Sequence, residues 1–189
     1  MKRNYVFLAK GFEELEAVTI IDLLRRAGLC VELISAVEGT LEVLGAHGIV
    51  VKAEKSLDEV DAAEADWLLL PGGFDGTTNL AASEKVSTLL KNHAAAGGNI
   101  GAICAAPAIV LAPLGLLKGR EATCYPGLED KCVEGGAKMV NIPVVTDRNL
   151  ITGNGPAAAI EFAAAVIAHA LNVNVAREVT EGLLYNRDY

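Results

Sequence analysis

A cysteine stands where an apolar segment meets a run of small residues, in Gly101-Ala102-Ile103-Cys104-Ala105-Ala106-Pro107. We interpret this segment as a strand that turns sharply into a helix. A nucleophile on such a turn is exposed at the sheet edge, and the helix N-terminus favours its anion. We therefore expect Cys104 to have a lowered pKa and to react as the thiolate. The alternative is a buried thiol that acts as a small hydrophobic side chain.

Two adjacent glycines follow a second apolar segment, in Leu70-Pro71-Gly72-Gly73. Because glycine has no Cβ atom, such a pair lets backbone N–H groups face a ligand, as an oxyanion site requires. An ordinary turn would use the same residues, so the motif is informative only if its strand neighbours the one before Cys104. On that condition we predict an oxyanion site at Gly72 and Gly73.

Three glutamates open the first helical segment of the chain. Glu13 and Glu14 are explained by the helix dipole, which favours carboxylates in a first turn. Glu16 has Phe12 and Ile20 four residues to either side on the same helix face. A carboxyl group on such an apolar stripe is desolvated, which raises its pKa toward the range of a general acid or base. Most of this helix is apolar, so periodicity alone barely favours Glu16 over Glu13.

The chain has four cysteines, and we expect all of them to be free thiols in a reducing cytoplasm. Four are too few for a small disulfide scaffold, and the apolar run at residues 5–9 is too short for a secretory signal. Cys30 and Cys132 have structural interpretations, at the start of a strand and in a short helical stretch. Cys124 could approach Cys104 as a resolving thiol.

The three histidines lie far apart and no C-x-x-C pair occurs, so a metal site has little support. We interpret His47 and His93 as solvated surface residues. His169 lies late in an alanine-rich helical segment, where a partly buried or helix-end position is expected.

Composition and charge limit the kinds of partner. The 189 residues include 16 basic and 24 acidic side chains, for a net charge of −8, and 52% are hydrophobic. We expect one folded domain over 1–189 rather than a disordered chain. An acidic chain lacks the basic surface that nucleic acids and anionic membranes require. Residues 100–117 are uncharged, but their two prolines and two glycines favour a soluble strand, turn and helix over a membrane span.

Apolar strands alternate with helices along the chain, which indicates a parallel sheet covered on both faces. Gly28 follows the first helix as a C-terminal glycine, and Ser83 precedes the next helix as its N-cap. We predict a doubly wound, flavodoxin-like α/β sandwich with a mainly parallel sheet. The predicted strands are 4–9, 30–36, 49–53 (an edge strand or hairpin arm), 66–70, 99–103, 122–125, 144–146 and 150–152; the predicted helices are 12–27, 84–96, 105–111 and 156–171.

Three segments, GFEELEAV, LLLPGGFDGTTNL and GAICAAPAIV, occur in an order and spacing that resembles the ThiJ/PfpI superfamily. Within it, the chain is similar to the branch of the Parkinson-disease protein deglycase and its bacterial YajL relatives. The likeness extends over nearly the whole chain, through Arg25-Arg26-Ala27-Gly28 and Gly153-Asn154-Gly155-Pro156. The combination is specific, although no single piece is.

The resemblance implies roles for particular residues. Cys104 corresponds to the elbow nucleophile, and Glu16 to the buried glutamate that contacts it. Gly72 and Gly73 correspond to the oxyanion-binding turn. Further positions that the resemblance places at the site or at a dimer interface are Ala105, Tyr125, Asn154, Gly155 and Pro156 for the site, and Arg26 for the interface.

Two positions depart from the family pattern. Ala105 stands where PfpI-like proteases have a histidine after the cysteine, so a Cys-His peptidase dyad is absent. Tyr125 stands where the deglycase branch usually has a histidine near the site. A tyrosine with the ordinary pKa of about 10 can donate a hydrogen bond but is a poor base at neutral pH. Glu16 would then carry the proton transfers.

The resemblance implies a cytoplasmic, homodimeric glyoxalase or deglycase that acts on small α-oxoaldehydes such as methylglyoxal, or on their adducts, without a cofactor or metal. The alternative is a redox-sensing stress-response protein or chaperone, because a reactive Cys104 is also open to oxidation. A role in thiamine biosynthesis and a peptidase activity have less support than either.

Overall fold

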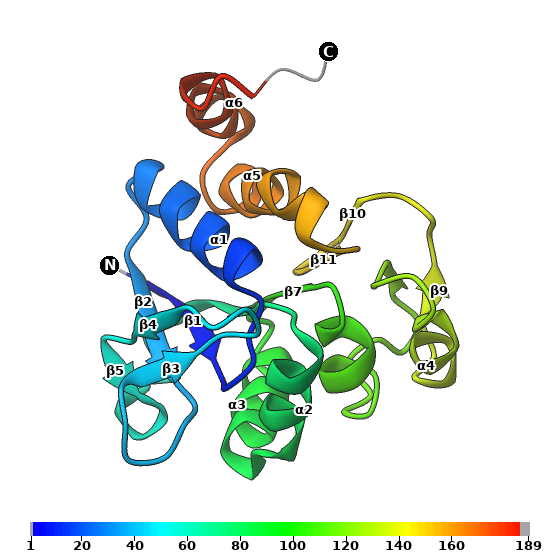
Figure 1. Ribbon diagram of the computed structural model, residues 1–189. Coiled ribbons are helices and arrows are strands. Elements are labelled where there is room, and N and C mark those ends of the chain that lie inside the picture. The colour runs from blue at the N-terminus through cyan, green and yellow to red at the C-terminus, as the bar shows by residue number, and fades with distance from the viewer. Residues whose placement is uncertain (1, 186–189) are drawn as a thin grey trace.

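The structure is a computed structural model and describes residues 2–185. A seven-stranded sheet runs through it, with helices on both faces (Figure 1). All neighbouring strands of this sheet pair parallel except β10 and β11, which are antiparallel. The predicted doubly wound, mainly parallel sheet is therefore confirmed. The order across the sheet is β10 (Val144–Asp147), β11 (Leu150–Gly153), β7 (Asn99–Ile103), β6 (Ala65–Leu70), β1 (Arg3–Leu8), β2 (Val31–Ser35) and β5 (Lys55–Ser56).

Helices cover the two faces of the sheet in separate groups (Figure 1). The first group is α1 (Glu14–Arg26) and α5 (Ala159–Ala170), and α6 (Val173–Gly182) packs on the outer side of α5. The second group is α2 (Phe74–Ala82), α3 (Glu84–Ala95) and a π-helical turn at Pro107–Leu111. The short helix α4 (Glu129–Glu134) packs against that turn. Short 3₁₀ turns occur at Leu57–Glu59 and Pro156–Ala158.

Each face of the sheet has its own hydrophobic core, and the side chains of the central strands point alternately into one core and the other. In β6, Trp67 and Leu69 belong to the core under α1 and α5, whereas Leu68 and Leu70 belong to the core under α2 and α3. Successive side chains of a strand point to opposite faces, so a strand covered on both faces is apolar throughout. This explains why β1, β6 and β7 are easily recognised in the sequence as continuous apolar runs.

Two small sheets lie outside the main one. β3 (Glu42–Leu44) and β4 (Val50–Lys52) form an antiparallel hairpin, and β8 (Glu121–Ala122) pairs parallel with β9 (Lys138–Met139). The hairpin interpretation of residues 49–53 is confirmed. The strand predicted at 122–125 is wrong beyond its first residue, because the chain leaves β8 to pass beside the elbow at Cys104.

Two helices were not predicted, and their sequences show why. α2 contains a glycine and two threonines, and α6 is rich in β-branched residues, which lowers the helix propensity of both. In α2, Gly76 allows a close approach, because a Cβ atom there would lie 2.7 Å from the backbone of Phe12. Tertiary packing therefore overrides local preference at this helix.

The surface position predicted for His93 is wrong, because this residue is 6% exposed. Its Nε2 lies 3.1 Å from the carbonyl oxygen of Asn99 and 3.3 Å from that of Asp66. Gly98 makes room for the ring, since a Cβ atom there would lie 2.2 Å from Cε1. Burial lowers the pKa of His93, so the ring is a neutral part of the core.

None of the helices within residues 2–185 is both long enough and apolar enough to cross a membrane. The uncharged stretch from residue 100 to residue 117 contains most of β7 and the π-helical turn instead.

Candidate active site

The three motifs singled out in the sequence meet at one edge of the sheet. β6 pairs with β1 on one side and β7 on the other, and all three run parallel. Their carboxyl ends therefore lie together, which is where open α/β sheets bind ligands. The strand before Gly72 and Gly73 is the neighbour of the strand before Cys104, so the condition placed on the glycine motif is met.

Cys104 lies on a strained turn directly after β7. Its φ is 64°, a left-handed conformation that residues with a Cβ atom rarely adopt and that is often found at functional sites. Two backbone hydrogen bonds hold the turn: its N–H donates to the oxygen of Gly153 at 2.9 Å, and its oxygen accepts from Tyr125 at 2.8 Å. The residue as a whole is 7% exposed.

Gly72 allows the acid and the thiol to meet. A Cβ atom on Gly72 would lie 2.4 Å from Cβ of Cys104 and 2.6 Å from Oε2 of Glu16. The Gly72 N–H donates to that same oxygen of Glu16 at 2.6 Å. This N–H is therefore already used and is not free for an oxyanion. The N–H groups of Gly73 and Ala105 instead point at the Cys104 sulfur.

Glu16 is fully buried and hydrogen bonds the Cys104 thiol. Burial raises the pKa of this carboxyl to about 7, and the charge of Glu13 adds to the effect, while the Gly72 N–H opposes it. The carboxyl is thus poised to gain and lose a proton near neutral pH. The raised pKa inferred from the apolar stripe is what the structure shows.

The lowered pKa predicted for Cys104 is wrong. Burial, followed by the charge of Glu16, raises the pKa of the thiol to about 12. The N–H groups of Gly73 and Ala105 oppose this shift but do not outweigh it. The sulfur is therefore a thiol at rest, and it needs a base to become nucleophilic. Glu16 hydrogen bonds the thiol, and with a pKa of about 7 a large share of this carboxyl is ionised near neutral pH and able to accept a proton.

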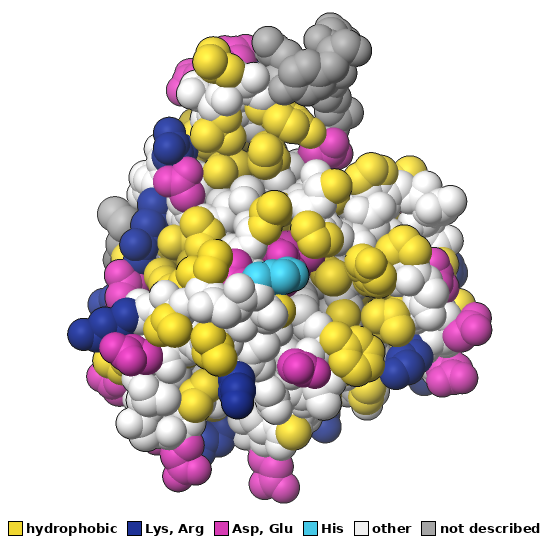
Figure 2. All heavy atoms as spheres, viewed as in Figure 1, with side chains coloured by type: hydrophobic (Ala, Val, Ile, Leu, Met, Phe, Trp, Pro, Cys, Tyr) yellow, Lys and Arg dark blue, Asp and Glu magenta, His cyan; other side chains and the backbone are white. Residues whose placement is uncertain are grey.

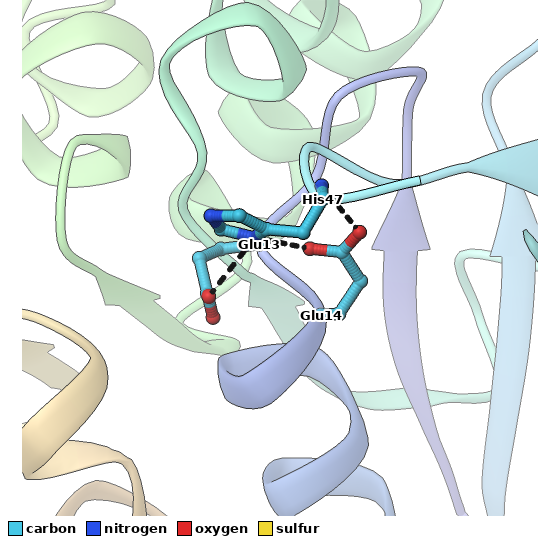
Figure 3. A group of neighbouring side chains, drawn as sticks. All are labelled: Glu13, Glu14 and His47. Carbon is cyan, nitrogen blue, oxygen red and sulfur yellow. Dashed lines mark hydrogen bonds and ion pairs between the residues drawn. The ribbon is translucent and has the colours of Figure 1, made fainter. Parts of the chain in front are cut away.

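A second group of titratable side chains lies next to this pair, at the start of α1 (Figure 3). Glu13 caps the helix, accepting the Glu16 N–H at 2.7 Å, and its own N–H donates to the oxygen of Gly72 at 3.0 Å. The sequence interpretation, a dipole effect alone, missed this. Glu13 therefore bonds the backbone of both Glu16 and Gly72, the two residues that meet at the Cys104 thiol.

Glu14 holds the β3–β4 hairpin against α1 (Figure 3). Its Oε1 accepts the backbone N–H of His47 at 2.6 Å and that of Ile49 at 3.3 Å, and its Oε2 lies 2.8 Å from Nδ1 of His47. Burial would raise the pKa of Glu14, but these hydrogen bonds outweigh it and leave the pKa lowered. The same contact raises the pKa of His47, which is exposed as predicted but is also bonded.

Glu13, Glu14 and His47 are the one group in the described part of the chain whose possible ligand atoms lie within 4.8 Å of one another. Their contacts join the hairpin to the helix and use all four carboxylate oxygens, since Oε1 of Glu13 lies 3.8 Å from Nδ1 of His47. The structure thus supports a positioning role for the group.

Tyr125 lies at the mouth of the site, with 48% of its surface exposed. Gly155 faces its ring, since a Cβ atom on Gly155 would lie 3.4 Å from Cδ2 of the tyrosine. Asn154 and Pro156 follow β11 and are not among the residues that line the cavity beside Cys104. That cavity encloses about 370 Å³.

Sequence reasoning missed Phe74, which lines the same cavity and is 64% exposed. Its position directly after Gly73 was the available signal.

The remaining cysteines and Arg26 lie in other surroundings. Cys124 and Cys132 are buried and hydrogen bond one another, and this contact together with burial raises the pKa of Cys124. A resolving role for Cys124 stays a prediction. Cys30 is partly exposed. Arg26 is exposed and bonds Asp22 of its own helix at 2.7 Å, and its interface role also stays a prediction.

The fold and these contacts define an α/β protein whose cysteine sits on a nucleophile elbow and shares a hydrogen bond with a buried glutamate. The chain belongs to the DJ-1/PfpI family, whose family profile matches residues 2–169. This confirms the superfamily resemblance found in the sequence.

Relatives of similar length support the assignment. A Parkinson disease protein 7 homolog from Danio rerio is 36% identical over 185 residues, which are 97% of each chain. A glutathione-independent glyoxalase from Caenorhabditis elegans is 36% identical over 155 residues, covering 82% of this chain and 81% of that protein. The structure of oxidized Toxoplasma gondii DJ-1 matches with a TM-score of 0.92 and 38% identity over 100% of both chains.

Other relatives are longer than this chain. Two DJ-1 homologues from Arabidopsis thaliana are each 41% identical over 160 residues, and the matched part is 36% and 40% of their lengths.

Proposed function

We propose that this chain is a cofactor-independent enzyme that converts small α-oxoaldehydes such as methylglyoxal, or their adducts with protein side chains, into hydroxy acids. For a free α-oxoaldehyde the overall reaction adds one water, and for an adduct it also releases the protein side chain as its free amine or thiol. The aldehyde carbon is oxidised by two electrons and the neighbouring ketone carbon is reduced by two, so no external oxidant is needed.

The reaction begins with addition of Cys104 to the aldehyde carbon. As the sulfur–carbon bond forms, the thiol proton passes to the Glu16 carboxylate. The aldehyde oxygen becomes an oxyanion, for which we propose the N–H groups of Gly73 and Ala105 as donors, since both bond the neighbouring sulfur at rest. Glu16 then passes the thiol proton to this oxygen, which gives the hemithioacetal and restores the carboxylate.

Glu16 then moves a proton between the two carbons. It removes the proton from the former aldehyde carbon to give an enediolate, in which the hydroxyl proton on the sulfur-bearing carbon moves to the former ketone oxygen. Glu16 then returns its proton to the former ketone carbon, which leaves a thioester and an alcohol. Water hydrolyses the thioester, which restores the Cys104 thiol and releases the hydroxy acid. For methylglyoxal the product is lactate.

The observation that carries the proposal is the pairing of Glu16 with Cys104. A carboxyl whose pKa is raised to about 7 contacts a thiol that needs a base, at the wall of a cavity large enough for the aldehyde. The name of the Caenorhabditis elegans relative, a glutathione-independent glyoxalase, supports the same chemistry. Tyr125 is not required as a base in this scheme.

The test is lactate production from methylglyoxal without glutathione. We expect wild-type turnover to be lost in Cys104→Ser and reduced at least 100-fold in Glu16→Gln. Cys30→Ser, which changes a thiol away from the site, is the matched control and should retain full activity. Equal turnover in wild type and Cys104→Ser would refute the proposal.

Redox sensing is the second candidate, and one observation favours it. The same N–H groups and a protonated Glu16 could hydrogen bond the oxygens of a sulfinate on Cys104. The raised pKa of the thiol argues against it, because the thiolate is the form that peroxide oxidises. Absent turnover, with a gain of two oxygens on Cys104 under mild peroxide, would favour this candidate.

We also propose that the protein is a homodimer and works in the cytoplasm. Figure 2 shows hydrophobic side chains gathered on the face that carries α1 and the β3–β4 hairpin. The exposed apolar residues of these elements are Leu15, Val18, Leu44, Ile49 and Val50. Free thiols fit a reducing compartment.

A further inference from the structure

The cavity beside Cys104 is apolar and carries no charge on its walls. Besides the thiol, its lining residues are Phe74, Ala105, Tyr125, Pro126, Gly127 and Leu128. None of these residues is an aspartate, glutamate, lysine, arginine or histidine. The carboxyl nearest to the thiol is Glu16, whose own charge would repel an anion.

Two aromatic side chains border this cavity, and the backbone that carries each of them lies beside the Cys104 turn. Phe74 opens α2 directly after Gly73, whose N–H points at the sulfur. Tyr125 is bonded through its N–H to the oxygen of Cys104, and Gly155 lies against its ring. The rings are 64% and 48% exposed, so their surfaces are available to a ligand.

A methyl group leaves most of a 370 Å³ cavity empty. An aryl group would bury far more apolar surface and could stack on either ring. A carboxylate or phosphate in the same place would lose its hydration without gaining a charged partner. The size of the cavity therefore favours an aryl group over a methyl group, and its uncharged walls favour a neutral group over an anion.

We propose that this cavity is a subsite for the substituent of the substrate, and that it selects uncharged aryl α-oxoaldehydes over methylglyoxal and over anionic ones. The proposal rests on the proposed function, and phenylglyoxal is its simplest test compound. The reaction adds water to phenylglyoxal to give mandelate, with the same internal transfer of two electrons.

The experiment compares kcat/KM for phenylglyoxal, methylglyoxal and 4-carboxyphenylglyoxal. We expect phenylglyoxal to exceed methylglyoxal at least 10-fold in wild type, and the added carboxylate to remove most of that gain. In Phe74→Ala the ratio of phenylglyoxal to methylglyoxal should fall at least 5-fold. Val133→Ala, which shortens an exposed apolar side chain on α4, is the control and should leave the ratio unchanged.

The outcomes separate the two proposals. Turnover of methylglyoxal with no preference for phenylglyoxal, or a ratio that Phe74→Ala does not change, would overturn the subsite alone. If neither aldehyde is turned over, the proposed function fails, and alkylation of Cys104 still tests the cavity. N-benzyl-2-iodoacetamide should then react faster than iodoacetamide, relative to their rates with free cysteine, in wild type but not in Phe74→Ala. Equal relative rates in wild type would overturn the subsite.

Discussion

At the scale of single residues, Glu16 has opposite effects on activity and on stability. Its buried carboxylate is the base that we propose for Cys104, yet burying that charge disfavours the folded state. The pKa of Glu16 is raised from its ordinary value of 4.5 to about 7 in the fold. Between these two values the unfolded chain loses the proton while the folded chain keeps it, so stability falls as pH rises.

Glu16→Gln should therefore be inactive but more stable than wild type at pH 8. The gain should vanish at pH 4, where the carboxyl is protonated in both states. A shift of this size corresponds to about 3 kcal/mol at most. Chemical denaturation of both proteins at the two pH values measures it, and a stability difference independent of pH would contradict the account.

The sequence predicted the identity of the pair and the raised pKa of Glu16, but not the raised pKa of Cys104. Cys104 and Glu16 were found from a turn motif, an apolar stripe and a family resemblance, and the structure brings them together. The pKa of the thiol depends on how deeply the elbow is buried and on the charge beside it, and neither follows from local spacing. The use of the Gly72 N–H by Glu16 is likewise a tertiary contact.

At the scale of elements, the β3–β4 hairpin and α1 act together. Glu14 ties the hairpin to the helix that carries Glu16, and Ala46 donates a backbone bond to the oxygen of Phe12 at 2.8 Å. The hairpin residues are about 30 positions from their partners on the helix, so no local sequence pattern predicts the contact. The main strands and helices were predictable because their apolar periodicity is local.

Glu14→Ala should loosen this hairpin. It removes the charged acceptor of the N–H groups of His47 and Ile49, which we expect to cost about 2 kcal/mol of unfolding free energy. Hydrogen exchange should become faster across Glu42–Lys52 and stay unchanged in β6. Glu178→Ala, an exposed carboxylate on α6, is the control. Unchanged exchange in the hairpin would show that Glu14 does not hold it.

At the scale of the whole molecule, the order of the strands in the sheet determines where the candidate active site forms. The three central strands bring segments near residues 16, 72 and 104 to one edge, although about 90 residues separate the first from the last. The alternation of strands and helices predicts the sheet class, but the neighbour relations that assemble the site come from the fold.

The proposed homodimer is also a property of the whole molecule. Val18→Arg places a charge on the exposed face of α1 and should shift the protein toward monomer in sedimentation velocity. Val133→Arg, an equally exposed valine on α4, should leave the oligomeric state of wild type unchanged. A wild-type protein that is monomeric at micromolar concentration would contradict the dimer.

The most direct test of Glu16 as the base for Cys104 is the pH dependence of kcat/KM with methylglyoxal. The carboxylate is the active form, so kcat/KM should rise with pH and level off above an apparent pKa of about 7. A profile that stays flat through neutral pH and rises only near pH 9 or above would contradict the account, because the thiol would then ionise without the help of Glu16.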